Sequence, residues 1–278
     1  MITEMKLSFI KPRRELQPYV ESIWIFESPI GLPTTDTSIV PPNGCPKLLF
    51  LYENRLVSFT NGKTQNSPPQ KLYFVGNKEN TVSVRSSSRR TGFIGVEFSP
   101  HVGFSVFGIP MSETFDCLWE ADALFDKWGR ETQEILNNLE KVESKVAFIQ
   151  EQLIFLVQKN ARDNRLVEFC VKTLKSTDGR ISIQELERKL GYSRRYLDLL
   201  FKQHVGLAPK VLAGIFRFQR FYRQWAQGLS FDLFKQDLYD FYYDQAHFTK
   251  EFKKMTGHSP RKFSLKISNE FGRRLLLR

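Results

Sequence analysis

The chain has 278 residues, 41% of them apolar, which is enough for two domains that each bury a core. Its 41 Lys and Arg exceed its 30 Asp and Glu and give a net charge of +11. No stretch approaches the roughly 20 consecutive apolar residues of a membrane span, and the N-terminus carries no secretory signal pattern. Three widely separated cysteines without metal-ligand spacing are typical of reduced thiols. These features predict a soluble cytoplasmic protein that does not contact membranes.

The first hundred residues predict β-strands. Short β-branched or aromatic runs occupy residues 22–26, 47–52, 55–59, 71–75, 81–85 and 93–98. Clusters of Pro, Gly, Asn and Ser separate these runs, as in a small antiparallel sandwich or barrel. Their aromatic side chains, such as Trp24, Phe26, Phe50 and Tyr52, either line an apolar cavity or belong to an ordinary core.

The pattern changes from Arg130 onward. Apolar residues recur at helical spacing between Ile135 and Leu156 and predict two helices that meet near Glu143 and Ser144. These helices either pack on the β-rich domain or present an apolar seam to a second chain, so residues 131–158 are the candidate homodimer contact. A polar run at 158–164 predicts the link between a β-rich domain, residues 1–160, and a second domain, residues 161–278.

The second domain holds the whole positive excess. Residues 161–278 carry 24 Lys and Arg against 12 Asp and Glu, whereas residues 1–160 carry 17 against 18. Such a density of cations neutralises phosphates and indicates salt-dependent binding to nucleic acid. An acidic protein or an anionic membrane surface is the alternative partner.

Helical patterns fill the second domain. We expect helices at 166–176, at 183–190 behind a capping box formed by Ser182 and Glu185, at 193–204, at 212–227 and at 244–255. Tyr192 and Leu197 are expected to anchor the turn at Gly191 against the core. Arg217, Arg220 and Arg223 are expected on a solvated face, where one of them is a candidate phosphate contact.

Part of this domain is duplicated. Phe201-Lys202, Gly206 and Pro209 return as Phe252-Lys253, Gly257 and Pro260, with an offset of 51 residues at each position. Each copy ends a short predicted helix. A duplicated helix-turn-helix presents two similar helices, and this arrangement suits the repeating grooves of duplex DNA.

Residues 165–265 resemble the DNA-binding domain of the AraC/XylS family of bacterial transcription regulators. The resemblance rests on Leu190-Gly191-Tyr192-Ser193, on the repeated motif, and on Tyr242-Tyr243-Asp244-Gln245-Ala246-His247-Phe248 with Gly257-His258-Ser259-Pro260. A weaker resemblance to the cupin-like sensory domain of such regulators rests on residues 41–50 and 92–100. It implies an α+β chain: an N-terminal cupin-like β-sandwich or barrel with flanking helices, then an all-α domain of two helix-turn-helix motifs joined by a long helix.

The resemblance also implies the residues that meet DNA. The two outward helices enter consecutive major grooves, with Arg195, Asp198 and Leu199 as base readers in the first copy, and Gln245, Ala246, Thr249 and Lys250 in the second. Lys202 and Lys253 are expected to hold phosphate. Ser193, Arg194 and Asp244, at the helix starts, complete the candidate set.

The second copy departs from the family pattern. Glu187 and Asp237 stand where the family usually has Ala, and Phe241 replaces the turn glycine. Gln236 and Asp240 fall where the first copy has Leu186 and Leu190. We therefore expect a rotated supporting helix or a reshaped turn in the second copy, and weaker base reading by it.

The sequence indicates neither catalysis nor a cofactor. The four histidines are scattered, and no His-x-His pair, phosphate-binding glycine loop or nucleophile elbow is present. The leading hypothesis is a sequence-specific transcription regulator with duplex DNA as its partner, and the resemblance adds RNA polymerase and a small-molecule effector as candidate partners. Activation is favoured over repression. The alternatives are a non-specific nucleic-acid-binding protein and a cupin-like enzyme with a basic C-terminal domain.

Overall fold

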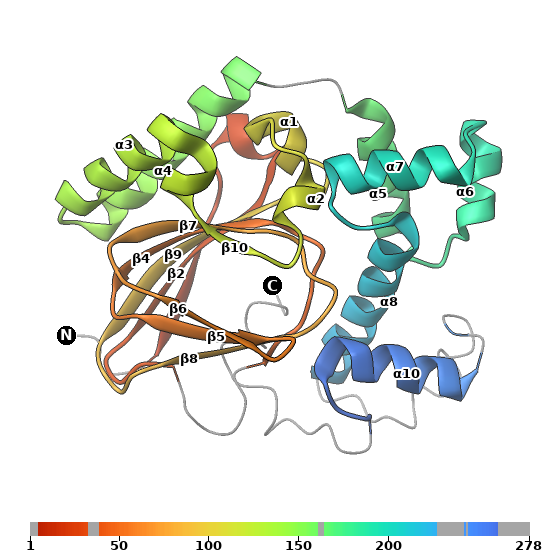
Figure 1. Cartoon of the computed structure of the whole chain (residues 1–278), viewed down its shortest axis with the longest axis horizontal. Coiled ribbons are helices and arrows are strands. Elements are labelled where there is room, and N and C mark those ends of the chain that lie inside the picture. The colour runs from red at the N-terminus through yellow and green to blue at the C-terminus, as the bar shows by residue number, and fades with distance from the viewer. Residues whose placement is uncertain (1–4, 33–38, 161–163, 227–241, 243, 261–278) are drawn as a thin grey trace.

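The computed structural model describes residues 5–32, 39–160, 164–226, 242 and 244–260, and it begins with two antiparallel β-sheets (Figure 1). The six-stranded sheet has the order β1-β2-β9-β4-β7-β10, and the four-stranded sheet has the order β3-β8-β5-β6. The first sheet is formed by β1 (Lys6–Ile10), β2 (Val20–Ser28), β9 (Thr91–Phe98), β4 (Lys47–Glu53), β7 (Lys71–Val75) and β10 (Leu118–Glu120). The second is formed by β3 (Ile39–Val40), β8 (Val82–Ser86), β5 (Leu56–Thr60) and β6 (Lys63–Ser67).

All six predicted strands are confirmed, with ends within two residues of those observed. Four strands, β1, β3, β6 and β10, were not predicted from the sequence. In β6 only Ser67 is buried, so this edge strand carries no apolar alternation. Backbone pairing with β5, from Leu56 with Ser67 to Thr60 with Lys63, holds it in place.

Two cores lie on the two faces of the six-stranded sheet. The inner core, between the sheets, gathers Trp24, Phe26, Leu51, Leu56 and Phe93. The outer core packs the other face of the sheet against helices that follow β9. Strand β9 is buried along its whole length because it lies between β2 and β4 and is covered on both faces.

Helices α1 (Gly103–Phe107), α2 (Met111–Thr114), α3 (Ala121–Asn138) and α4 (Val142–Asn160) cover the outer face, together with the short 3-10 helix η1 (Arg14–Leu16) (Figure 1). The predicted helix pair is confirmed, but its boundary is wrong. The chain leaves α3 at Leu139, which is extended, and starts α4 at Val142. The α3 segment also begins at Ala121 rather than near Arg130, with non-helical backbone at Phe125 and Asp126.

The apolar stripe of α3 and α4 is buried within its own chain. Leu136, Val146, Ile149 and Leu153 are at most 4% exposed and belong to the outer core. This is the packing interpretation of the pattern. The homodimer through residues 131–158 stays a prediction, and the large apolar side chains left exposed on these helices are Ile135 and Phe155.

The C-terminal half is helical: α5 (Arg165–Ser176), α6 (Ile183–Leu190), α7 (Arg194–His204), α8 (Pro209–Ala226) and α10 (Gln245–Thr256). These helices share a third core that includes Leu186, Leu197, Phe201, Phe218 and Phe252. An N-terminal antiparallel β-domain with flanking helices followed by an all-α half confirms the predicted fold class. The predicted rotation of the second supporting helix concerns residues 231–241, which lie outside the described residues.

Candidate nucleic-acid interface and ligand cavity

Helices α6 and α7 form a helix-turn-helix whose ends are fixed by local hydrogen bonds. The predicted capping box is confirmed: Glu185 N donates to Ser182 Oγ at 3.1 Å, and Ser182 N donates to Glu185 Oε2 at 2.9 Å. The hydrogen bonds from Ser182 lower the pKa of the Glu185 carboxyl. Gly191 ends α6 with φ of 71°, the left-handed conformation that glycine adopts without strain.

Glu187 has a role that the sequence did not suggest. Its Oε1 accepts the backbone N–H of Arg194, the first residue of α7, at 2.5 Å. A carboxylate at a helix N-terminus satisfies a free donor and interacts favourably with the helix dipole. The residue that departs from the family pattern therefore caps the outward helix. An acidic residue just ahead of a predicted helix start is the sequence signal for this role.

Helix α7 presents most of its predicted DNA-contacting residues to solvent. Ser193 is the N-cap and accepts the N–H of Tyr196, while Leu197 and Phe201 are fully buried. Arg194, Arg195, Leu199 and Lys202 are exposed, and Asp198 is half-buried. Arg194 Nε lies 3.8 Å from Asp198 Oδ2, a solvent-exposed pair that contributes little to stability.

The turn before α7 corrects one prediction. Leu197 anchors the turn as expected, but Tyr192 is 44% exposed. Its ring stacks on that of Tyr196, also 44% exposed, at a centroid distance of 4.9 Å. The pair adds aromatic surface beside the candidate interface.

Helix α10 has the same design. Asp244 is its N-cap and accepts the N–H of His247 at 2.7 Å. Phe248 and Phe252 are buried against Phe218 and Phe221 of α8. The outward positions are confirmed as exposed at Gln245, Ala246, Lys250 and Lys253, and Thr249 is half-buried.

Helix α8 separates the two outward helices. It has 18 residues, about 27 Å of helix, and α7 and α10 pack at different levels along it (Figure 1). Two of its arginines correct the prediction of a solvated face. Arg217 donates to Gly179 O at 2.6 Å and pairs with Glu251 of α10 at 3.4 Å, and Arg220 pairs with Asp178 at 2.6 Å. Arg223 is exposed as predicted.

The C-terminal ends of α7 and α10 both contact the β-domain. At α7, the Asn77 side-chain amide donates to Val205 O at 2.8 Å, and a Cβ at Gly206 would lie 2.6 Å from Met111 O. At α10, Lys254 pairs with Glu79 at 2.7 Å. Because each helix is held at its C-terminal end, the N-terminal halves with the predicted base-reading residues are left uncovered.

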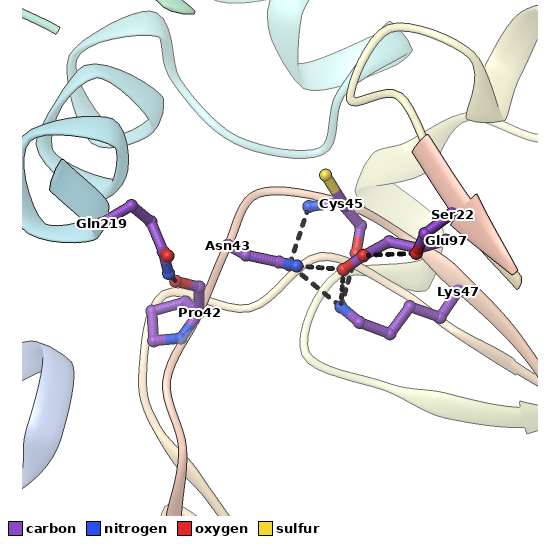
Figure 2. A network of polar contacts seen from close by, with 7 residues as sticks. All are labelled: Ser22, Pro42, Asn43, Cys45, Lys47, Glu97 and Gln219. Atoms are coloured by element: carbon purple, nitrogen blue, oxygen red, sulfur yellow. Dashed lines mark hydrogen bonds and ion pairs between the residues drawn. The ribbon is translucent and has the colours of Figure 1, made fainter. Parts of the chain in front are cut away.

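A second contact between the halves runs through the connection of β3 and β4. Gln219 of α8 donates to Pro42 O at 2.6 Å in a buried hydrogen bond (Figure 2). A Cβ at Gly44, whose φ is +75°, would lie 2.5 Å from Leu212 Cδ1. Only glycine fits this close approach to α8 without displacing it.

The same connection is tied to the sheet by a buried carboxylate. Glu97 in β9 is 2% exposed and accepts hydrogen bonds from Ser22 Oγ and from the Asn43 side-chain amide (Figure 2). Lys47 Nζ lies 3.4 Å from Glu97 Oε1 and donates to Asn43 Oδ1 and Cys45 O, both at 2.9 Å. Burial of an ion pair with several hydrogen bonds fixes this loop in one geometry.

A cavity of about 130 Å³ lies in the β-domain beside these loops. Its lining is mainly apolar and comes from both sheets and from residues 41–45 and 76–80, including Trp24, Leu49, Leu51, Val84 and Phe93. Of the four aromatic residues considered from the sequence, Trp24 lines the cavity, and Phe26 and Phe50 are core. Tyr52 packs against the outer core.

Titratable and thiol groups of the described chain form no metal-ligand cluster. No group of three or more His, Cys, Asp or Glu with suitable geometry occurs among the residues searched. Cys45, Cys117 and Cys170 are free thiols, and burial raises the pKa of Cys170 to about 11. His247 bonds locally as predicted, 3.5 Å from Glu251. None of the described helices is both long and apolar enough to cross a bilayer.

Comparison with known proteins gives partial matches. A family model described as "Domain of unknown function (DUF6597)" matches residues 8–119, which lie in the β-domain. No curated protein matches. Unsaturated fatty acid bound wild-type ToxT from Vibrio cholerae strain SCE256 aligns at 10% identity over 90% of this chain and 97% of that chain, with a TM-score of 0.47. A cupin superfamily protein from Desulfitobacterium hafniense aligns at 11% identity over 35% of this chain and 80% of that chain, with a TM-score of 0.27.

Proposed function

We propose that the chain is a sequence-specific transcription regulator that binds duplex DNA through α7 and α10. The observation that supports this function most is the common design of the two helices. Each has a side-chain N-cap, an exposed polar N-terminal half and a buried aromatic face, and the motif residues of the two copies differ by 51 positions throughout. Two such helices on one scaffold suit consecutive major grooves.

The roles of individual residues belong to the same proposal. Arg195, Asp198 and Leu199 read bases from α7, and Gln245, Ala246, Thr249 and Lys250 read bases from α10. Lys202 and Lys253 neutralise phosphates, and Ser193, Arg194 and Asp244 contact the DNA backbone near the helix starts. Residues 161–278 form the DNA-binding domain, and residues 1–160 form the domain that receives a signal.

The cavity in the β-domain supports an effector-responsive regulator. It is enclosed by loops that also contact α7 and α8, so occupancy of the cavity can alter the helices. An effector acts only if it binds two states of the protein with different affinity. RNA polymerase is the expected protein partner of the DNA-bound form.

Selection of binding sites from random duplex DNA with the full chain tests this function. We expect enrichment of a motif with two half-elements about 10 bp apart. Arg195→Ala should relax the preference at one half-element, and Gln245→Ala at the other. Lys127→Ala, a change at a side chain 84% exposed on α3, is the matched control and should leave the motif unchanged. Binding that follows charge alone, with no enriched motif, would instead identify a non-specific nucleic-acid-binding protein.

A further inference from the structure

The loop of residues 76–81, between β7 and β8, contacts the cavity and both outward helices. Gly76, Asn77, Lys78 and Asn80 line the cavity. The loop also joins a strand of the six-stranded sheet to a strand of the four-stranded sheet. It therefore forms part of the cavity wall on the side that faces the helical half.

The two helix contacts of this loop fall at matching positions of the sequence repeat. Asn77 donates to Val205 O at 2.8 Å, at the residue that ends α7. Lys254 in the last turn of α10 pairs with Glu79 at 2.7 Å, and a Cβ at Gly257 would lie 3.9 Å from Thr81 Cγ2. Gly206 and Gly257, adjacent to these contacts, are equivalent residues of the two copies. One short loop thus holds the same end of both helices.

Asn77 carries an unused acceptor at this position. The residue is 3% exposed, and its side-chain nitrogen is committed to Val205 O. Its Oδ1 is buried and has no hydrogen-bond partner among the residues that the structure describes. A buried acceptor left in this state is costly, and a donor supplied by a ligand removes the cost.

The cavity indicates what kind of molecule could supply that donor. A cavity of about 130 Å³ is close to the ~150 Å³ of an apolar protein cavity that holds benzene. The one ammonium group in its lining that pairs with a buried carboxylate, Lys47, already meets Glu97, Asn43 and Cys45. An apolar site whose cation is already neutralised favours a neutral ligand.

We infer that the cavity takes a small neutral molecule of about the size of phenol, with an apolar body and one hydrogen-bond donor that binds Asn77 Oδ1. This inference rests on the proposed function for its second half: the ligand displaces Asn77 and the 76–81 loop, and the loop alters the positions of α7 and α10. Asn77 is then the ligand contact, and Glu79 is a positioning residue that transmits the change to α10.

Phenol and toluene are the probes for the ligand half, because they have nearly the same shape and only phenol has a donor. Calorimetric titration of the full chain should detect phenol binding. The ratio of the toluene Kd to the phenol Kd should fall about tenfold on going from the wild type to Asn77→Ala, since the donor then loses its acceptor. Comparison of ratios cancels the different hydration of the two probes. No phenol binding, or an unchanged ratio in a folded Asn77→Ala, would overturn the assignment.

The coupling half is measured on a duplex enriched in the selection experiment. Phenol should change the Kd for that duplex at least fivefold in the wild type and less than twofold in Glu79→Gln, which removes the ion pair with Lys254 without touching the cavity lining. Glu53→Gln, which removes the exposed pair with Arg90, is the matched control and should keep the fivefold response.

The Glu79 comparison also stands if Asn77→Ala fails to fold. An enriched duplex whose binding does not respond to phenol overturns the coupling and leaves the proposed function intact. Failure to enrich any duplex overturns the proposed function, and the ratio of the two Kd values is read without DNA.

Discussion

Ala in place of Gly206 should destabilise the protein much more than Ala in place of Gly191. Both glycines follow a helix of the first helix-turn-helix with left-handed backbone, φ of +77° and +71°. In that conformation an alanine costs about 1–2 kcal/mol at either position. The two changes also lower the entropy of the unfolded chain equally, so these contributions cancel in the comparison.

The surroundings of the two glycines differ. A Cβ at Gly191 would meet nothing within 4 Å, whereas a Cβ at Gly206 would lie 2.6 Å from Met111 O and 3.1 Å from Met111 C. Met111 begins α2 in the β-domain, and its backbone cannot rotate away as a flexible side chain would. Inserting an atom into such a contact typically costs about 1–3 kcal/mol. We therefore expect a loss of about 1–2 kcal/mol for Gly191→Ala and about 2–5 kcal/mol for Gly206→Ala.

Urea unfolding followed by intrinsic fluorescence measures the difference, with the midpoints compared at equal slope. Equal losses for the two variants would refute the tight seating of α7 on the β-domain. The same pair of variants bears on regulation, because Gly206 follows Val205, which accepts the hydrogen bond from Asn77.

The remaining predictions concern DNA binding and pH. Lys202→Ala should weaken binding to all duplexes alike and reduce the slope of log K against log salt by about 0.9, measured by fluorescence anisotropy; an unchanged slope would exclude a phosphate contact. Arg195→Ala should weaken binding to the enriched duplex by about 1–3 kcal/mol and more than Lys250→Ala does, and equal losses would contradict weaker reading by the second copy. Burial lowers the pKa of both His101 and His204 in the folded chain, so below the unfolded pKa of about 6.5 the unfolded chain binds protons that the folded chain does not. Stability should thus fall between pH 7 and pH 5, and His204→Gln should lessen that fall; a superimposable pH profile would show that His204 does not contribute.

The sequence predicted best what local chemistry controls. The capping box at Ser182 and Glu185, the turn at Gly191 and the buried positions Leu197 and Phe201 depend on residues within one or two helical turns of each other. A side-chain cap or a glycine with positive φ needs no distant partner. These features can be read from a single sequence for that reason.

Contacts between distant segments were not predictable in the same way. Arg217 and Arg220 fall at spacings typical of a solvated helix face, yet their partners are Gly179, Glu251 and Asp178. Nothing in the spacing of charges shows that the loop after α5 and helix α10 both reach α8. The exposed position of Tyr192 is similar, since stacking on Tyr196 substitutes for the expected burial.

The loop at 76–81 shows the limit most clearly. Its residues are polar and read as a turn between strands, and only the fold brings them to the ends of α7 and α10. The cavity likewise has no linear signal, because its lining comes from both sheets and two loops. Sequence reasoning could identify the candidate DNA contacts, but not the part of the β-domain that touches the helices.

The two outward helices are attached to the β-domain with different strength. At α7 the attachment is a buried hydrogen bond from Asn77 and a backbone approach at Met111 that excludes even a Cβ. At α10 it includes the pair of Lys254 and Glu79, with Lys254 44% exposed, and ordinary van der Waals space at Gly257. Exposed ion pairs contribute about 0–1 kcal/mol, so this contact can break and reform at little cost. Movement of the 76–81 loop should therefore shift α10 relative to α7, and the spacing of the two helices is the quantity on which recognition of consecutive grooves depends.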